Sequence, residues 1–379
     1  MPEGQNGISG AIVKPVFLVD RKVYQGYSSY IRRILVGLTG TADASALVCP
    51  SCVNTEAILC PSVQLLEHPA LRLPVFWSQN RRILLERLSR FKPTILHTFY
   101  PGQIRLAHWL SQQLEIPYVL TLHRSPPKWL FYEKPFRHSA GIIAPSETVA
   151  GELQKSRRGF NGRLKRIHVG SFVEDTCRCF SRQHQIPCLI AVHRLDDISV
   201  FKPLLNAVRH LMLDGFDLMV AIMGQGRKEK TIRRQIRSLG LTSVVTVVPP
   251  MRPLRSIFGG ADIYLHLDDT GCFDGLLLEA MAVGLAVTGA PEQNSGLLKD
   301  GQTARFWDKD DELSIYACLK RLLGQRAETR QLAINGQAYL REHNSVSRMV
   351  DKLMEAYIDA QQWYKEHHKN LEKEPIIIG

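Results

Sequence analysis

The stretch ADIYLHLDDTGCFDGLLLEAMAVGLAVTGAPEQNSGLLKDGQTARFW, residues 261–307, decides the fold. It reads as a buried strand over 263–267, a short acidic loop, and a helix that opens near Gly275; a second buried strand follows over 285–289. Free N–H groups at the helix N-terminus, around Gly275 and Leu276, favour an anion. Glu279 lies one turn inside that helix. Because ligands of an open α/β sheet bind beyond the carboxyl ends of its strands, this stretch predicts a ligand site.

The rest of the chain alternates short apolar runs with segments of helical periodicity. Strands are expected at 15–19, 46–48, 93–97, 118–122, 141–144, 166–169, 188–192, 218–223 and 244–248. Helices are expected at 27–38, 80–90, 104–114, 146–155, 202–212, 227–239, 253–258, 313–323, 328–342 and 345–365. This alternation predicts the α/β class with doubly wound parallel sheets, and the polar stretch 172–185 separates two such halves. We therefore expect two Rossmann-like domains facing each other across a deep crevice.

Composition is that of an ordinary globular protein: 379 residues, 45% hydrophobic and 22% charged. The formal net charge of +12 suggests a polyanionic partner, either nucleic acid, an anionic membrane or a phosphorylated substrate. No nucleic-acid-binding motif supports the first, so no nucleic acid is expected. No apolar run is long enough to span a membrane, and the N-terminus lacks a signal-peptide pattern, which favours a cytoplasmic protein. Cys49 and Cys52 have ligand-like spacing but no second pair, so no metal site is expected.

Three motifs of the second half, in this order, carry a family resemblance. They are LEAMAVGLAV at 278–287, KDGQT at 299–303, and REHNS at 341–345 followed by Tyr357. The chain resembles the large retaining family of GT-B glycosyltransferases (glycosyl transferases group 1), which includes bacterial mannosyl- and glucosyltransferases. The resemblance spans about residues 14–364. It implies an acceptor-side domain over 1–175, a nucleotide-sugar-binding domain over 176–345, and a C-terminal helix with a loose tail, 346–379, that crosses back to the first domain.

The implied activity is transfer of a hexose, with retention and without a metal, from a nucleotide diphosphate donor. The donor would be UDP- or GDP-linked, and the acceptor a carbohydrate or a lipid-linked glycan in polysaccharide or glycolipid synthesis. By resemblance, Glu279 binds the ribose hydroxyls, and Arg194, in VHRLD at 192–196, binds the diphosphate. The family's partner Lys would fall at Ser199, and Lys202 is the nearest substitute. The plainer alternatives are a first-turn Glu that suits the helix dipole and a surface Arg.

Glycines follow two of the predicted strands. Gly224 and Gly226 match the family's G-x-G turn, where missing side chains let a nucleotide approach the backbone; an ordinary turn after a strand is the alternative. Gly26 stands for the family's paired-glycine loop near the diphosphate, although bulky Tyr27 follows it.

The family's first site carboxylate, beside the donor sugar, is missing: its place is Gly271. Asp268, Asp269 and Asp274 lie close by, and we take Asp269 and Asp274 as the candidate catalytic substitutes. A shifted Asp is shorter and points differently, so the departure also supports an alternative function. In that alternative the protein is a catalytically impaired partner subunit that binds a nucleotide sugar or a glycan.

His123, in the sequence Thr121-Leu-His123, matches the family's T-x-H, whose His lies near the reacting sugar. A neutral imidazole is suited to handling a proton or positioning a hydroxyl. The alternative is a strand-end His satisfied by the backbone. His97 resembles another family His and is expected to be structural.

Aromatic and basic residues alternate over 125–138 (SPPKWLFYEKPFRH), close after His123. With the basic helix at 80–90, this loop suits an anionic membrane surface, and a packed loop with Trp129 and Phe131 in the core is the alternative. The sequence therefore predicts a peripheral contact with the cytoplasmic face of a membrane.

Overall fold

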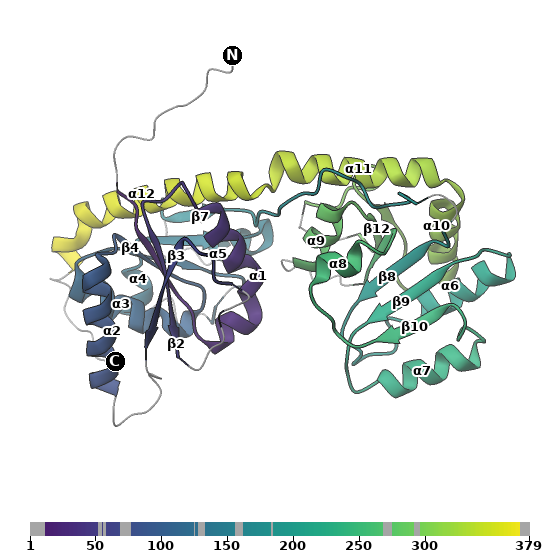
Figure 1. Ribbon diagram of the computed structural model, residues 1–379, viewed down its shortest axis with the longest axis horizontal. Helices are drawn as coiled ribbons and strands as arrows, with labels where there is room; N and C mark the ends of the chain where they lie inside the picture. The colour runs from purple at the N-terminus through teal and green to yellow at the C-terminus, as the bar shows by residue number, and fades with distance from the viewer. Residues whose placement is uncertain are drawn as a thin grey trace, which may run out of the picture. The chain divides into compact units, whose positions relative to one another are not determined.

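The computed structural model describes residues 12–51, 55, 58–68, 77–124, 126–127, 133–155, 162–182, 185–267, 275–291 and 296–371. The chain forms two compact units: unit 1 is Met1–Gly170 with Val346–Gly379, and unit 2 is Ser171–Ser345 (Figure 1). The chain thus passes between the units twice, after Gly170 and after Ser345, and each unit is described by itself.

Unit 1 contains a seven-stranded parallel sheet in the order β3-β2-β1-β4-β5-β6-β7. The strands are β1 (Pro15–Leu18), β2 (Ser45–Pro50), β3 (Val63–His68), β4 (Ile95–Thr98), β5 (Tyr118–Thr121), β6 (Gly141–Ala144) and β7 (Leu164–Arg166). The helices are α1 (Arg21–Gly37), α2 (Trp77–Phe91), η2 (Pro101–Gln103), α3 (Ile104–Leu114), α4 (Lys134–Arg137), α5 (Glu147–Lys155) and α12 (Val346–Leu371). Every residue of β1, β4, β5 and β6 is buried, as expected for parallel strands covered on both faces.

Helix α1 begins earlier than the apolar periodicity predicts, because Asp20 caps it. The Asp20 carboxylate accepts a hydrogen bond from Val23 N at 2.8 Å, satisfying one of the free donors of the first turn. The helix is interrupted at Tyr27, whose φ of −132° and ψ of 16° are not helical. The predicted start at residue 27 therefore marks the second segment of a kinked helix.

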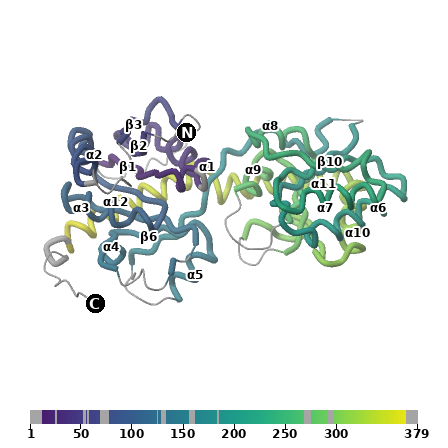
Figure 2. The backbone as a smooth tube through the Cα atoms, turned by 90° about the horizontal axis from the view of Figure 1, so that it is seen from below, coloured from purple at the N-terminus to yellow at the C-terminus, as the bar shows by residue number. Residues whose placement is uncertain are grey.

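Helix α12, yellow in Figure 2, lies along unit 1 beside β5, β6 and α1. Gly37 permits this approach, since a methyl group at its Cβ position would lie 2.6 Å from Val346 Cγ1 and Val350 Cγ2. The Tyr357 hydroxyl is buried and lies 2.7 Å from His97 Nδ1. The last helix is therefore part of the core of unit 1.

Unit 2 contains a six-stranded parallel sheet in the order β10-β9-β8-β11-β12-β13. The strands are β8 (Cys188–Val192), β9 (Met219–Met223), β10 (Val245–Val248), β11 (Ile263–His266), β12 (Ala286–Gly289) and β13 (Arg305–Phe306). The helices are α6 (Lys202–Leu213), α7 (Glu229–Ser238), α8 (Leu254–Phe258), α9 (Gly275–Val283), α10 (Glu312–Gly324) and α11 (Arg326–His343). The predicted α/β class, with two Rossmann-like units, is confirmed.

Two details of the predicted strands are wrong. Strand β3 was not expected, because its sequence VQLLEH mixes buried and exposed positions at the edge of the sheet. The last strand of unit 1 is β7, not residues 166–169. Ile167 and Val169 are buried but lie beyond the ladder, so their apolar character marks burial rather than strand pairing.

Candidate functional site

In unit 2, the loops that follow β8 and β9 are interlocked. Leu195 N donates to Gln225 O at 3.1 Å, and Lys228 N donates to Leu195 O at 2.7 Å. A methyl group at Gly226 would lie 2.8 Å from Asp196 N and closer still to the Leu195 carbonyl group; one at Gly224 would collide with His193 O. Both glycines are therefore required by the neighbouring backbone, which is a different reason from the approach of a nucleotide.

Arg194 lies on the loop that these glycines hold. Its side chain is 85% exposed, and its guanidinium donates from Nε to Asp196 Oδ2 at 2.8 Å, with Nη2 at 2.6 Å from the same oxygen. Asp196 also accepts from Arg227 N at 3.0 Å, and these two hydrogen bonds, the Arg227 one first, lower the pKa of its carboxyl group. Arg194 is thus oriented by a carboxylate while its head remains accessible to an anion.

Lys202 is the first residue of α6 and is exposed. Because α6 directly follows the β8 loop, its first residue lies at the same end of the sheet as the loop that bears Arg194. The two cations predicted for the diphosphate therefore come from one βα connection.

Glu279 lies in the second turn of α9, the helix that begins with Gly275 and Leu276. Its carboxylate is only 13% exposed, and Oε2 is 2.8 Å from Arg255 Nε of α8. Arg255 also donates to Ser171 Oγ at 3.4 Å and to Phe172 O. Sequence reasoning missed Arg255, because nothing in the spacing of residues 255 and 279 shows that α8 packs on α9.

The stretch with the candidate substitutes for the missing carboxylate lies outside the described residues. It spans 268–274 and includes Asp268, Asp269, Gly271 and Asp274. The assignment of Asp269 and Asp274 therefore stays a prediction. In unit 1, Gly26 is placed in the first segment of α1, just before the kink at Tyr27.

His123 follows β5 and is enclosed by two tyrosine rings. The Tyr27 ring stacks on it at 3.9 Å between centroids with an interplanar angle of 12°, and the Tyr30 ring meets it edge-on at 5.2 Å and 90°. Burial lowers the pKa of His123 to about 3. The imidazole is therefore neutral near pH 7, which suits positioning a hydroxyl by hydrogen bonding better than donating a proton.

His97 has a structural role. Its Nδ1 lies 2.7 Å from the Tyr357 hydroxyl and its Nε2 lies 2.7 Å from Thr121 Oγ1, so both ring nitrogens are used inside the core. Burial, and to a smaller extent the His123 ring, lower its pKa to about 3.

A cavity of about 900 Å³ opens beyond β4 and β5 of unit 1. Aromatic and charged side chains line it, among them Tyr27, Phe99, Tyr100, Arg105, His123, Arg124 and Glu133. Cavities of this size, mostly apolar with a few polar groups, are typical of small-molecule sites.

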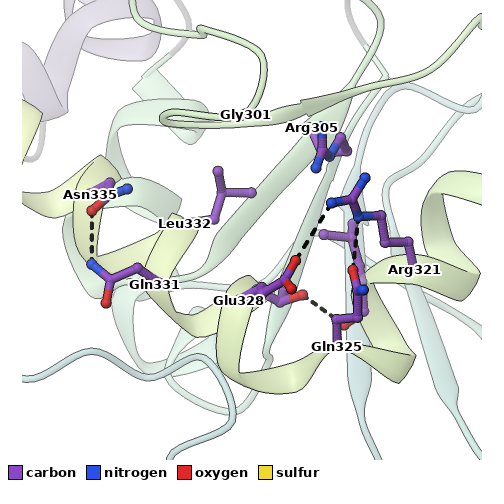
Figure 3. A pocket seen from close by; sticks show the side chains of 10 residues that line it. Gly301, Arg305, Arg321, Gln325, Glu328, Gln331, Leu332 and Asn335 are labelled. Carbon is purple, nitrogen blue, oxygen red and sulfur yellow. Dashed lines mark hydrogen bonds and ion pairs between the residues drawn. The ribbon is translucent and has the colours of Figure 1, made fainter.

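Unit 2 has a smaller hollow between α10, α11 and β13, shown in Figure 3. Arg321 there pairs with Glu328 at 3.5 Å and donates to Gln325 Oε1 at 2.8 Å, while Arg305 lies 3.8 Å from Asp300. These charges compensate one another, and none of the predicted donor residues lines the hollow.

Among the residues that the structure describes, no three His, Cys, Asp or Glu side chains are grouped to hold a metal ion. No helix in the same residues has the length and apolarity that crossing a membrane requires.

The loop predicted to contact a membrane is described only in part: residues 125 and 128–132, with Trp129 and Phe131, lie outside the described residues. Phe136, in α4, is fully buried and packs in the core of unit 1.

Two glycosyltransferase families match the chain, one for each unit. Residues 24–171 match the model of Glycosyltransferase Family 4, and residues 187–325 match that of Glycosyl transferases group 1. Together the two matches cover most of the chain. With two Rossmann-like units, they define the class: the chain is a glycosyltransferase of the GT-B fold. The donor substrate of this class of enzyme is a nucleotide sugar.

Solved structures share this fold at low sequence identity. A glycosyltransferase from Rickettsia africae is 13% identical, with a TM-score of 0.74 over 93% of this chain and 99% of that one. Anabaena HepE in complex with UDP is 15% identical, with a TM-score of 0.69 over 90% and 99%. The lipopolysaccharide outer core galactosyltransferase WaaB is 11% identical, with a TM-score of 0.65 over 91% and 99%. No curated protein sequence matches the chain significantly.

Proposed function

We propose that the protein transfers a hexose, with retention of configuration, from a nucleoside diphosphate sugar to a carbohydrate or lipid-linked acceptor. The observation that carries the proposal is the arrangement in unit 2. An accessible guanidinium, Arg194, lies on a rigid loop after β8, and a nearly buried carboxylate, Glu279, lies on the helix after β11. Strand ends of a parallel sheet are where such folds bind nucleotides.

Each residue has a separate role in this scheme. The Glu279 carboxylate accepts hydrogen bonds from the two ribose hydroxyls, and the Arg255 ion pair holds it in place. Arg194, Lys202 and the N–H groups at Gly275 and Leu276 stabilise the negative charge that develops on the leaving diphosphate. The diphosphate is already anionic in the bound donor and gains a further negative charge as the sugar leaves, so the stabilisation is larger in the transition state and lowers the barrier.

On the acceptor side, neutral His123 orients a hydroxyl of the donor sugar or the acceptor. Asp269 or Asp274 supplies the carboxylate that is missing at Gly271. UDP-glucose is the first donor to examine, because Anabaena HepE has been crystallised with UDP, with UDP and glucose, and with UDP-glucose.

We further propose a peripheral contact with an anionic membrane through α2. Arg82, Arg87 and Arg90 are exposed on this helix, and a lipid-linked acceptor would be reached there.

A thermal-shift screen with UDP-, GDP-, ADP- and TDP-sugars, followed by donor turnover with the one that binds, tests the proposal. We expect one nucleotide series to raise the melting temperature and its sugar to be released or transferred above background. Binding without turnover would instead favour the non-catalytic partner subunit. If no nucleotide sugar shifts the melting temperature, the proposed function is wrong.

A further inference from the structure

The cavity of unit 1 has an aromatic wall formed at the kink in α1. Because Tyr27 leaves helical geometry, its ring lies flat on the His123 imidazole and lines the cavity with Phe99 and Tyr100. Tyr30 closes the edge of the same imidazole. The apolar face of a sugar ring packs well on such a wall, since an aromatic ring offers a large and rigid contact area.

The wall itself carries no charge. His123 has its pKa lowered to about 3 by burial, and burial also raises the pKa of Tyr27, so both rings are neutral near pH 7. Any charge that the cavity offers to a ligand therefore comes from the side chains around these rings.

The charged side chains of the cavity do not balance. Arg105 is neutralised by Glu133, to which it donates twice, from Nε to Oε2 at 3.2 Å and from Nη2 to Oε1 at 2.8 Å. Arg124 is exposed and forms no ion pair with any other residue in the described ranges. Lys22 adds a second cation at the rim, 5.5 Å from the centre of the Tyr100 ring. Among the described residues, the side chains around the cavity therefore carry a net positive charge next to the aromatic wall.

We propose that this cavity binds an acceptor sugar that carries an anionic group, a carboxylate or a phosphate. Its ring packs on Tyr27 and its anionic group pairs with Arg124. This inference rests on the proposed function, because it names the acceptor of that reaction. An accessible guanidinium beside an aromatic surface is well suited to such a ligand, since Arg forms bidentate hydrogen bonds with either anion.

The test titrates the full chain with glucuronate, glucose 6-phosphate and glucose, followed by saturation-transfer NMR. We expect at least one anionic sugar to bind about tenfold more tightly than glucose. Arg124→Gln should remove this preference, whereas Arg166→Gln, which changes an exposed Arg of β7 outside the cavity, should keep it. Tyr27→Ala should weaken binding of all sugars about tenfold, and Tyr27→Phe should restore most of that loss.

The carboxylate and the phosphate are distinguished by which of the two sugars binds more tightly, and either result supports the inference. Equal binding of all three sugars, no binding of either anionic sugar, or an unchanged preference in Arg124→Gln would overturn it. A thermal-shift screen of the wild-type chain with UDP, GDP, ADP and TDP separates the two claims. Nucleotide binding without an anionic preference refutes only the inference, and absence of nucleotide binding refutes the proposed function.

Discussion

Gly226→Ala distinguishes two explanations of the glycine turn after β9: close packing on the loop after β8, or close approach of a nucleotide. The added methyl group would lie 2.8 Å from Asp196 N, and closer to the Leu195 carbonyl, where nonbonded atoms normally stand about 3.5–4.0 Å apart. The loop that bears Arg194 must therefore move by on the order of 1 Å. Overpacking of this kind costs about 1–3 kcal/mol, which corresponds to a fall in melting temperature of about 3–10 °C.

The assay is thermal unfolding of the full chain with and without UDP, with Gly324→Ala as the matched control. Gly324 ends α10 in the same unit, and a methyl group there meets nothing within 4 Å. We expect Gly226→Ala to lower both the melting temperature and the affinity for UDP, the latter about tenfold through displacement of Arg194. A Gly226→Ala protein as stable as the control would refute the close-packing explanation. If it also lost UDP binding, the glycine would serve the approach of the nucleotide.

Three further predictions concern unit 1. Tyr357→Phe removes the hydroxyl that lies against the buried His97 Nδ1, so it should destabilise the packing of α12 on unit 1 by about 1–3 kcal/mol. The amides of α12 should then exchange their hydrogens faster. Unchanged exchange would contradict this prediction. His97 and His123 have folded-state pKa values of about 3, below the unfolded value, so their contribution to stability is complete above about pH 6.5 and is lost as the pH falls towards 3. Between pH 7 and pH 5 the free energy of unfolding should therefore fall by about 2 kcal/mol for each histidine, and the urea midpoint should fall with it. Equal midpoints at the two pH values would argue against buried neutral imidazoles. Flotation with anionic liposomes at low salt should recover the wild-type chain and less of an Arg82→Gln/Arg87→Gln variant, and no flotation would exclude the membrane contact.

The fold was predictable because parallel strands buried on both faces leave a clear trace. The runs VFLV at 16–19, IIA at 142–144 and LIA at 189–191 are apolar throughout, and the structure buries every residue of them. Strand β3, at the sheet edge, has mixed burial and gives no such trace. Local apolar patterns therefore identify the central strands of a sheet and miss its edge strands.

Local sequence motifs suggest single site residues, but they do not show which residues of other elements contact them. Glu279 is assigned to the site by the family resemblance of its motif, and this assignment stays a prediction; its ion-pair partner Arg255 comes from another helix, which no local pattern signals. The place of Tyr27 on His123 depends on a kink within α1, which the sequence does not signal. Contacts between elements depend on packing and are not visible in local sequence patterns. That Asp269 or Asp274 replaces the carboxylate missing at Gly271 stays a prediction.

Calorimetric titration of the full chain with UDP and GDP tests the central claim, that unit 2 holds a nucleotide through Glu279, most directly. We expect one of the two nucleotides to bind, and Glu279→Gln to weaken that binding at least about tenfold. Glu328→Gln, which changes an exposed carboxylate of the same unit away from the site, should bind as the wild type does. Absence of binding by either nucleotide, or equal affinities of the wild type and Glu279→Gln, would contradict the claim.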